Sequence, residues 1–89
     1  MKLDELCAEL ESVARQLSVE VSYEDLRWEG ITGRGGLCRV RGKPLIIINK
    51  ALPKRERARI LARELSRLDL SRLFIPPAVR QWIEKAAQE

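Results

Sequence analysis

Leu-Cys-Arg-Val-Arg-Gly-Lys-Pro-Leu-Ile-Ile-Ile, residues 37–48, is the stretch of sequence that decides the fold of this chain. Two largely apolar runs, 37–40 and 45–48, flank a short polar segment that contains Gly42. This arrangement predicts an antiparallel β-hairpin with its turn at Gly42. The uninterrupted Ile46-Ile47-Ile48 run further predicts that the second strand is covered on both of its faces.

The segments on either side of the hairpin change from one hydrophobic period to another. Apolar residues recur at three- and four-residue steps over residues 3–17, which predicts an amphipathic helix, and the alternation over 19–23 predicts a strand. Two more helices are expected, over 53–69 and after Pro76-Pro77. The predicted fold class is α+β, with an N-terminal helix, a small antiparallel or mixed three-stranded sheet and two C-terminal helices.

The length and composition bound the class of protein. With 89 residues the chain is expected to form a single domain over 1–89. No apolar run approaches the roughly 20 residues of a membrane span, and acidic residues interrupt the stretch where a signal peptide would be apolar. We therefore expect a cytoplasmic protein with no membrane partner. In a reducing compartment Cys7 and Cys38 are expected as buried free thiols, and a disulfide between them is the alternative.

The charge of the chain is divided unevenly along its length. Residues 1–26 hold two basic and seven acidic residues, a net charge of −5, so the rest of the chain carries +9. One interpretation is structural, with the acidic helix lying against a basic body. The other leaves a basic surface free for an acidic partner.

Three stretches, within residues 19–70, resemble the ImmA/IrrE-type metallopeptidases: Gly35-Gly36-Leu37-Cys38-Arg39-Val40, Lys43-Pro44-Leu45-Ile46-Ile47-Ile48-Asn49 and Leu61-Ala62-Arg63-Glu64-Leu65-Ser66-Arg67-Leu68. In that family a hairpin and a strand ending in Asn lead to a helix with His-Glu-Leu-Gly-His. Its two imidazoles hold Zn²⁺, and its Glu acts on the metal-bound water.

The chain departs from this family at the residues that matter for chemistry. Arg63 and Arg67 stand at the two histidine positions, with Glu64 at the position of the general base, and the chain contains no His. A guanidinium cannot donate a lone pair to a metal. The family's third ligand is a carboxylate from a later helix, where Glu84 is the only candidate by position. The resemblance thus implies a pseudoenzyme without catalytic residues, metal or cofactor.

Four arginines at four-residue steps form a basic stripe beside the apolar face of the helix expected over 53–69. Most such stripes are solvated helix faces. The resemblance favours a functional hypothesis, a non-catalytic protein-interaction or regulatory module. In it an extended peptide or protein pairs with the edge strand at Gly36, Leu37, Arg39 and Arg41, and an anion or partner site is formed by Arg59, Arg63, Glu64 and Arg67.

The alternative hypothesis is a small basic nucleic-acid-binding protein. Phosphates would contact Arg34, Lys50, Lys54 and Arg55, and Trp28 would stack on a base. No recognised nucleic-acid motif accompanies these residues. A homodimer through the edge strand or the helix stripes is a further arrangement that the sequence leaves open.

Overall fold

The computed structural model describes residues 1–26 and 35–89, which form one sheet and three helices in the order expected from the sequence. The elements are α1 (Leu3–Gln16), β1 (Glu20–Glu24), β2 (Gly35–Val40), β3 (Lys43–Asn49), α2 (Lys54–Leu65) and α3 (Pro77–Ala87). The α+β class is confirmed, as are the N-terminal helix and the two C-terminal helices.

Helix α2 ends at Leu65, earlier than the apolar spacing predicts. The Ser66 hydroxyl donates a hydrogen bond to the Arg63 carbonyl at 2.5 Å. The Arg67 amide instead donates to the Glu64 carbonyl at 3.2 Å, three residues back. A serine that competes for a helix carbonyl and a three-residue hydrogen bond both tighten the chain and end the regular helix.

The sheet is mixed, with strand order β1-β3-β2. β1 pairs parallel with β3, and β2 pairs antiparallel with β3, so that Val21 and Leu37 both lie opposite Ile46. The hairpin turn consists of Arg41 and Gly42, whose φ angles are 54° and 79°. Two successive positive φ angles are typical of the tight turns that match the twist of a hairpin, and the turn predicted at Gly42 is confirmed. Arg41, predicted as an edge-strand residue, lies in this turn and outside β2.

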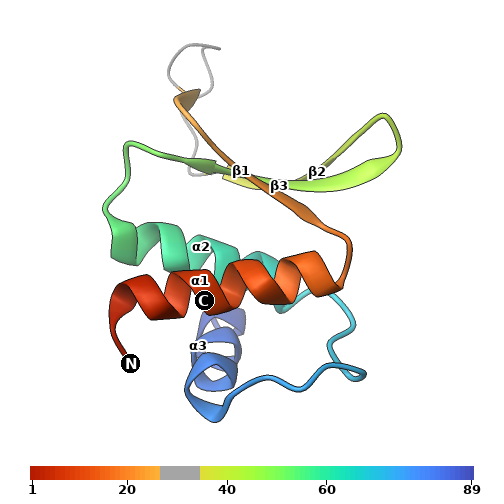
Figure 1. Cartoon of the computed structure of the whole chain (residues 1–89). Coiled ribbons are helices and arrows are strands. Elements are labelled where there is room, and N and C mark those ends of the chain that lie inside the picture. The colour runs from red at the N-terminus through yellow and green to blue at the C-terminus, as the bar shows by residue number, and fades with distance from the viewer. Residues whose placement is uncertain (27–34) are drawn as a thin grey trace.

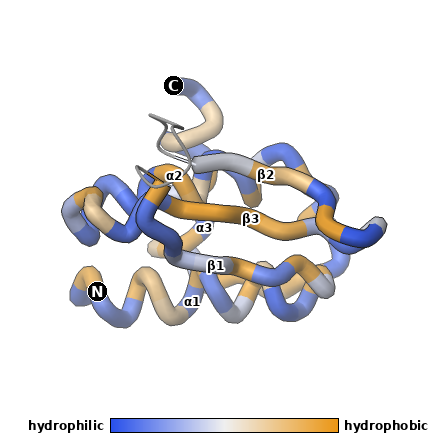
Figure 2. The backbone as a smooth tube through the Cα atoms, turned by 90° about the horizontal axis from the view of Figure 1, so that it is seen from above, coloured by the Kyte–Doolittle hydropathy of each residue, from blue (hydrophilic) through white to orange (hydrophobic). Residues whose placement is uncertain are grey.

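The helices lie on one face of the sheet (Figure 1). α1 and α2 pack directly against the strands, and α3 packs beneath them against α2 and α1. Viewed from above, the hydrophobic strand β3 runs between β1 and β2, with the helices behind the sheet (Figure 2). Cover on both faces of β3, as predicted, is not found among residues 1–26 and 35–89: Ile46 and Ile48 are fully buried, but Ile47 points to the face opposite the helices and is half-buried.

The core lies between the sheet and the helices. Its largest fully buried side chains are Leu10, Val13, Ile46, Ile48, Leu61, Leu65 and Val79. They come from all three helices and from the central strand, so a single apolar cluster holds the layers together. No helix within residues 1–26 and 35–89 is long and apolar enough to cross a membrane.

The acidic helix α1 lies beside the basic helix α2 (Figure 1). Lys54 at the start of α2 forms an ion pair with Asp4 in the first turn of α1. The pairing favours the structural interpretation of the uneven charge for this part of α2. Both side chains are largely exposed, so the pair contributes little to stability.

Candidate functional site

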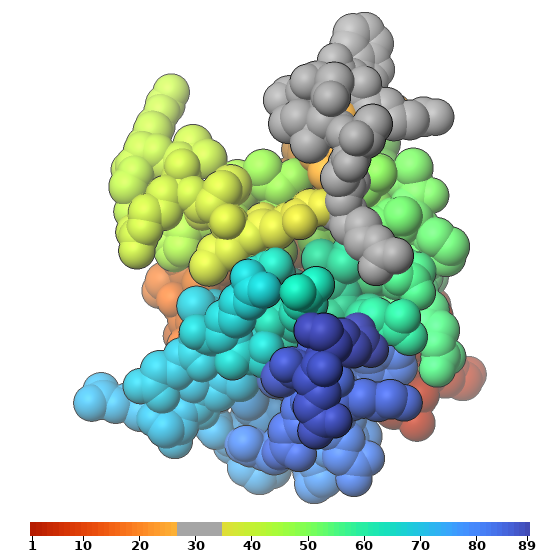
Figure 3. All heavy atoms as spheres, turned by 180° about the vertical axis from the view of Figure 1, so that it is seen from behind, coloured from red at the N-terminus to blue at the C-terminus, as the bar shows by residue number. Residues whose placement is uncertain are grey.

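The candidate site lies where the edge strand β2 runs over helix α2. Seen from behind, the yellow atoms of β2 lie at the surface directly above the teal atoms of α2 (Figure 3). Within the described part of the chain, β2 pairs with β3 alone, so its second edge has no strand partner. Leu37 and Val40 on this strand are 39% and 49% exposed. This is the edge that the sequence predicted.

Two glycines bring the backbone of β2 close to its neighbours. Gly35 has a φ of 123°, and a Cβ atom there would lie 2.0 Å from the carbonyl oxygen of Ile47. At Gly36 a Cβ would lie 3.7 Å from Glu64 Oε1, an ordinary contact distance. Glycine is therefore required at 35 for the strand to approach β3, and at 36 the strand lies directly beside the carboxylate of α2.

Glu64 is the one charged residue among the buried residues of the described chain, at 7% exposure. Its Oε2 lies 3.5 Å from Arg67 Nη1, at the outer limit of a hydrogen bond. The Arg67 side chain is 58% exposed, so it leans from solvent over the buried carboxylate. A buried carboxylate with so distant a partner retains acceptor capacity for another donor.

The structure separates the four residues predicted as one anion or partner site. Glu64 and Arg67 are in contact next to β2, and Arg63 is exposed. Arg59 is held elsewhere, by Glu56 at 3.3 Å and by Glu89 from the end of the chain at 3.5 Å. Arg59 and Arg67 thus have different ion-pair partners.

The residues predicted for the edge strand lie in two parts of the hairpin. Arg39 lies in β2 and is exposed, and its Nη1 donates to the Gly42 carbonyl at 3.1 Å, which ties its side chain to the turn. Gly36 and Leu37 lie in β2 beside α2, whereas Arg41 belongs to the turn. The part of the predicted edge that adjoins Glu64 is thus limited to the start of the strand.

Two of the residues predicted to contact nucleic acid have partners within the chain. Lys54 pairs with Asp4, Arg55 lies over the ring of Trp82 at 5.5 Å, and Lys50 is exposed. Arg34, together with Trp28, lies outside the described residues. The nucleic-acid hypothesis stays a prediction.

The residues at the family's zinc positions do not fit a zinc ion. Arg63 and Arg67 are permanently protonated, and Glu64 alone supplies an oxygen there. Within residues 1–26 and 35–89 no group of three His, Cys, Asp or Glu side chains could hold a metal. Glu84, the candidate for the third ligand, lines a separate hollow with Ser66 and Arg80.

A polar network between α1, β1 and α2 was not anticipated from the sequence. The Tyr23 hydroxyl donates to Glu11 Oε2 at 2.5 Å, and the Arg57 guanidinium lies 5.8 Å from the Tyr23 ring centre. Burial and the neighbouring Glu11 carboxylate raise the pKa of Tyr23 well above its ordinary value. Burial also raises the pKa of the Cys7 thiol, with Glu11 as the next cause. Both shifts favour the neutral form, so the network is better suited to holding α1 on the sheet than to proton transfer.

A second polar site, between α2 and α3, also escaped the sequence analysis. Trp82 and Lys85 lie three residues apart on the last helix, and Glu89 follows four residues later, just beyond the end of this helix. This spacing could have been noticed, but the partner residues Arg55 and Arg59 come from another helix.

Cys7 and Cys38 are both free and half-buried. The disulfide alternative is therefore not formed.

Comparison with models of known protein families, with curated proteins and with solved structures finds no match to this chain. The resemblance to the ImmA/IrrE-type peptidases thus stays a prediction, and the function is inferred from the residues themselves.

Proposed function

We propose that this chain is a non-catalytic protein-interaction module that binds an extended peptide along the edge of β2. The observation that carries the proposal is the position of this edge, which has no strand partner among the described residues and lies beside the buried carboxylate of Glu64. Edge strands offer main-chain groups to an added strand, and neighbouring side chains give selectivity.

The backbone of β2 supplies the binding groups. In an antiparallel ladder successive residues alternate in the direction of their N–H and C=O groups. About half of the six residues of β2 therefore point these groups away from β3. A peptide strand of similar length can satisfy them, and Leu37 and Val40 offer apolar surface to its side chains.

Glu64 and Arg67 supply the polar contacts beside this edge. Glu64 accepts a hydrogen bond from an N–H or a cationic side chain of the peptide, and the exposed guanidinium of Arg67 donates to a peptide carbonyl or carboxylate. The Glu64 carboxylate is almost excluded from water, and its one polar partner among the described residues is 3.5 Å away, so it gains from a new donor.

A non-catalytic role agrees with the chemistry of the side chains. The chain contains no His, the usual general base for a serine or cysteine nucleophile. Burial raises the pKa of Cys7, which opposes formation of a thiolate there. The arginines at the two histidine positions hold charge and donate hydrogen bonds, and neither activates water.

The test begins with peptides selected on the purified protein from a random displayed library. Each synthetic peptide is titrated into ¹⁵N-labelled protein while amide chemical shifts are recorded. We expect shifts and intermolecular NOEs at residues 35–40, and none at residues 20–24 of β1, which is the other edge of the same sheet. N-methylation of alternate peptide amides should abolish binding, because it removes main-chain donors and leaves the side chains intact.

Single substitutions with a matched control test which side chains contribute to peptide binding. Glu64→Gln and Arg67→Gln should each weaken binding several-fold, whereas Arg72→Gln, which removes one charge from an exposed loop residue, should not. Sedimentation of the free protein checks whether a second copy already occupies the edge. Peptides that shift only residues outside β2, or that bind equally well when N-methylated, would refute the proposal.

A further inference from the structure

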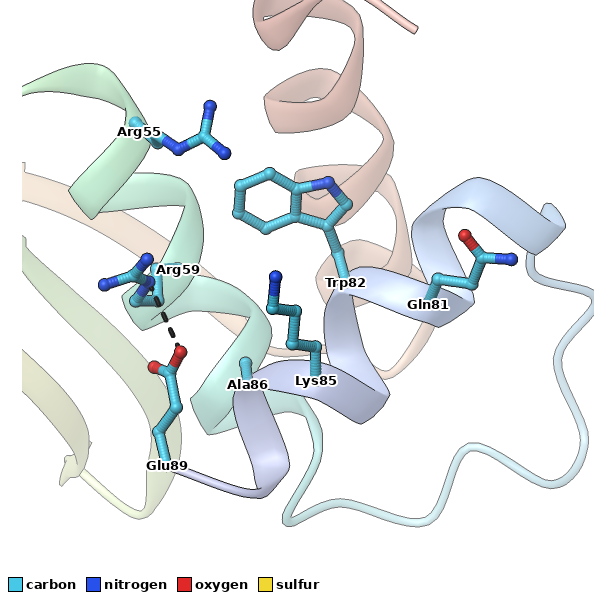
Figure 4. Close-up of a pocket in the computed structure, with 7 residues that line it drawn as sticks. All are labelled: Arg55, Arg59, Gln81, Trp82, Lys85, Ala86 and Glu89. Carbon is cyan, nitrogen blue, oxygen red and sulfur yellow. Dashed lines mark ion pairs between the residues drawn. The ribbon is translucent and has the colours of Figure 1, made fainter.

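A pocket of about 230 Å³ lies between α2 and α3 (Figure 4), and no residue of β2 lines it. It is lined by Arg55, Arg59, Gln81, Trp82, Lys85, Ala86 and Glu89. Sites for whole drug-sized ligands are larger, at roughly 300–1,000 Å³. This pocket therefore suits one small charged group better than a complete large ligand.

Three cations converge on this pocket from two helices. The Arg55 guanidinium lies over the Trp82 ring, 5.5 Å from its centre, and this stacking fixes its direction. The Lys85 side chain extends toward the space between Trp82 and Arg59, whereas Gln81 points away from it (Figure 4). Neither Arg55 nor Lys85 forms an ion pair with any residue that the structure describes.

An oxyanion of the protein itself already lies in this pocket. The carboxylate of Glu89 lies 3.5 Å from Arg59 Nε (Figure 4), and the two side chains are 39% and 38% exposed. Ion pairs of this length and exposure are weak. An incoming anion can thus displace Glu89 at little cost.

The charge balance selects the class of anion. With Glu89 displaced, the three cations and Glu56, which contacts Arg59 at 3.3 Å, leave a net charge of +2 in and beside the pocket. A carboxylate or a phosphodiester carries a single negative charge. A phosphomonoester carries about −1.5 to −2 at neutral pH, with three oxygens that accept charge-assisted hydrogen bonds.

We propose that the pocket formed by Arg55, Arg59, Trp82 and Lys85 binds a phosphomonoester group, which takes the place of the Glu89 carboxylate. The group comes either from a phosphorylated side chain of a partner protein or from a small phosphorylated metabolite. The chemistry at the pocket is the same for both. The site is independent of the peptide edge, so either proposal can fail alone.

Trp82 provides the readout. Trp28 and Trp82 are the only tryptophans, so a Trp28→Phe background makes the fluorescence report on the pocket. This protein is titrated with inorganic phosphate, a phosphoserine peptide, adenosine 5′-monophosphate and dimethyl phosphate. We expect a saturable change with the phosphomonoesters, weaker binding of dimethyl phosphate, and tighter binding of whichever of the peptide and the nucleotide resembles the natural source.

The variants separate a site from general attraction to a basic protein. Arg59→Gln and Lys85→Gln should each weaken binding at least about tenfold, since each removes a charge-assisted hydrogen bond. Glu89→Gln should strengthen binding by up to about fivefold, because it removes the internal competitor. Arg72→Gln, in an exposed loop, should change it little. Lys85 is exposed, so its variant is expected to fold, which circular dichroism checks. Absence of a saturable change with every phosphomonoester, equal binding of dimethyl phosphate, or an equal loss in Arg72→Gln would overturn the proposal.

Discussion

Replacing the buried carboxylate of Glu64 should make this protein more stable. The Glu64 side chain is 9% exposed, and within the described part of the chain it forms one ion pair, with Arg67 at 3.5 Å. It has therefore given up its hydration for a weak interaction with a guanidinium that is itself 58% exposed. Glu64→Leu removes the buried charge and leaves Arg67 in solvent.

The magnitude follows from two opposing contributions. Loss of the pair with the exposed Arg67 costs less than about 1 kcal/mol. Replacement of buried ionic groups by apolar side chains of similar volume is often neutral or stabilising, by about 1–4 kcal/mol. Because Glu64 lies at the edge of the core, we expect a gain near the lower end, about 1 kcal/mol, which is a rise in Tm of about 4–8 °C in a domain of this size.

The assay is urea unfolding followed by circular dichroism, for the wild-type protein, Glu64→Leu, Glu64→Gln and Arg67→Gln. Arg67→Gln is the control, because it breaks the same pair but leaves the carboxylate buried, and it should lower the free energy of unfolding slightly. A loss of more than about 1 kcal/mol in Glu64→Leu would show that the carboxylate is a net stabilising element, in contradiction to this reasoning. Gained stability with lost peptide binding would identify Glu64 as a residue kept for binding.

Three further predictions concern stability. Gly35→Ala should lower the free energy of unfolding by several kcal/mol or prevent folding, because its Cβ would lie 2.0 Å from a backbone oxygen at a φ of 123°. Gly36→Ala is the control: its Cβ would meet only a 3.7 Å contact, so this variant should stay folded in thermal melts. Ser18→Gly should raise the free energy of unfolding by about 0.5–1 kcal/mol in the same measurement, since Ser18 has a φ of 60° just after α1; an unchanged or lower value would contradict this. The raised pKa of Tyr23 means that the folded state holds this proton more tightly, so its contribution to stability is present below about pH 10 and is lost as pH rises above it. Tyr23→Phe should therefore lower the free energy of unfolding by about 1 kcal/mol, because it removes the hydrogen bond to Glu11. In urea unfolding at increasing alkaline pH, the stability of this variant should fall less steeply with pH than that of the wild-type protein. An equal fall with pH in both proteins would contradict the prediction.

How far the sequence alone reaches is clearest in the hairpin and in α2. The turn at Gly42 was predictable because glycine next to a polar residue between two apolar runs is a local pattern. The edge position of the preceding strand was an expectation from the family resemblance, and the strand order shows it. The end of α2 at Leu65 was not, because it depends on which carbonyl the Ser66 hydroxyl bonds. The half-buried position of Ile47 was missed for a related reason: a continuous apolar run does not reveal whether a second layer lies above the strand.

The sequence by itself determined the elements, their order and the α+β class, because hydrophobic period, glycine and proline act over a few neighbouring residues. The absence of His and the arginines at positions 63 and 67 likewise settle from sequence that these positions cannot supply zinc ligands. Only the tertiary structure decided which neighbours each arginine of the stripe has. It directs Arg59 to the pocket with Trp82 and sets Arg67 over Glu64 beside Gly36, because docking of α2 between the sheet and α3 gives each of its faces a different neighbour.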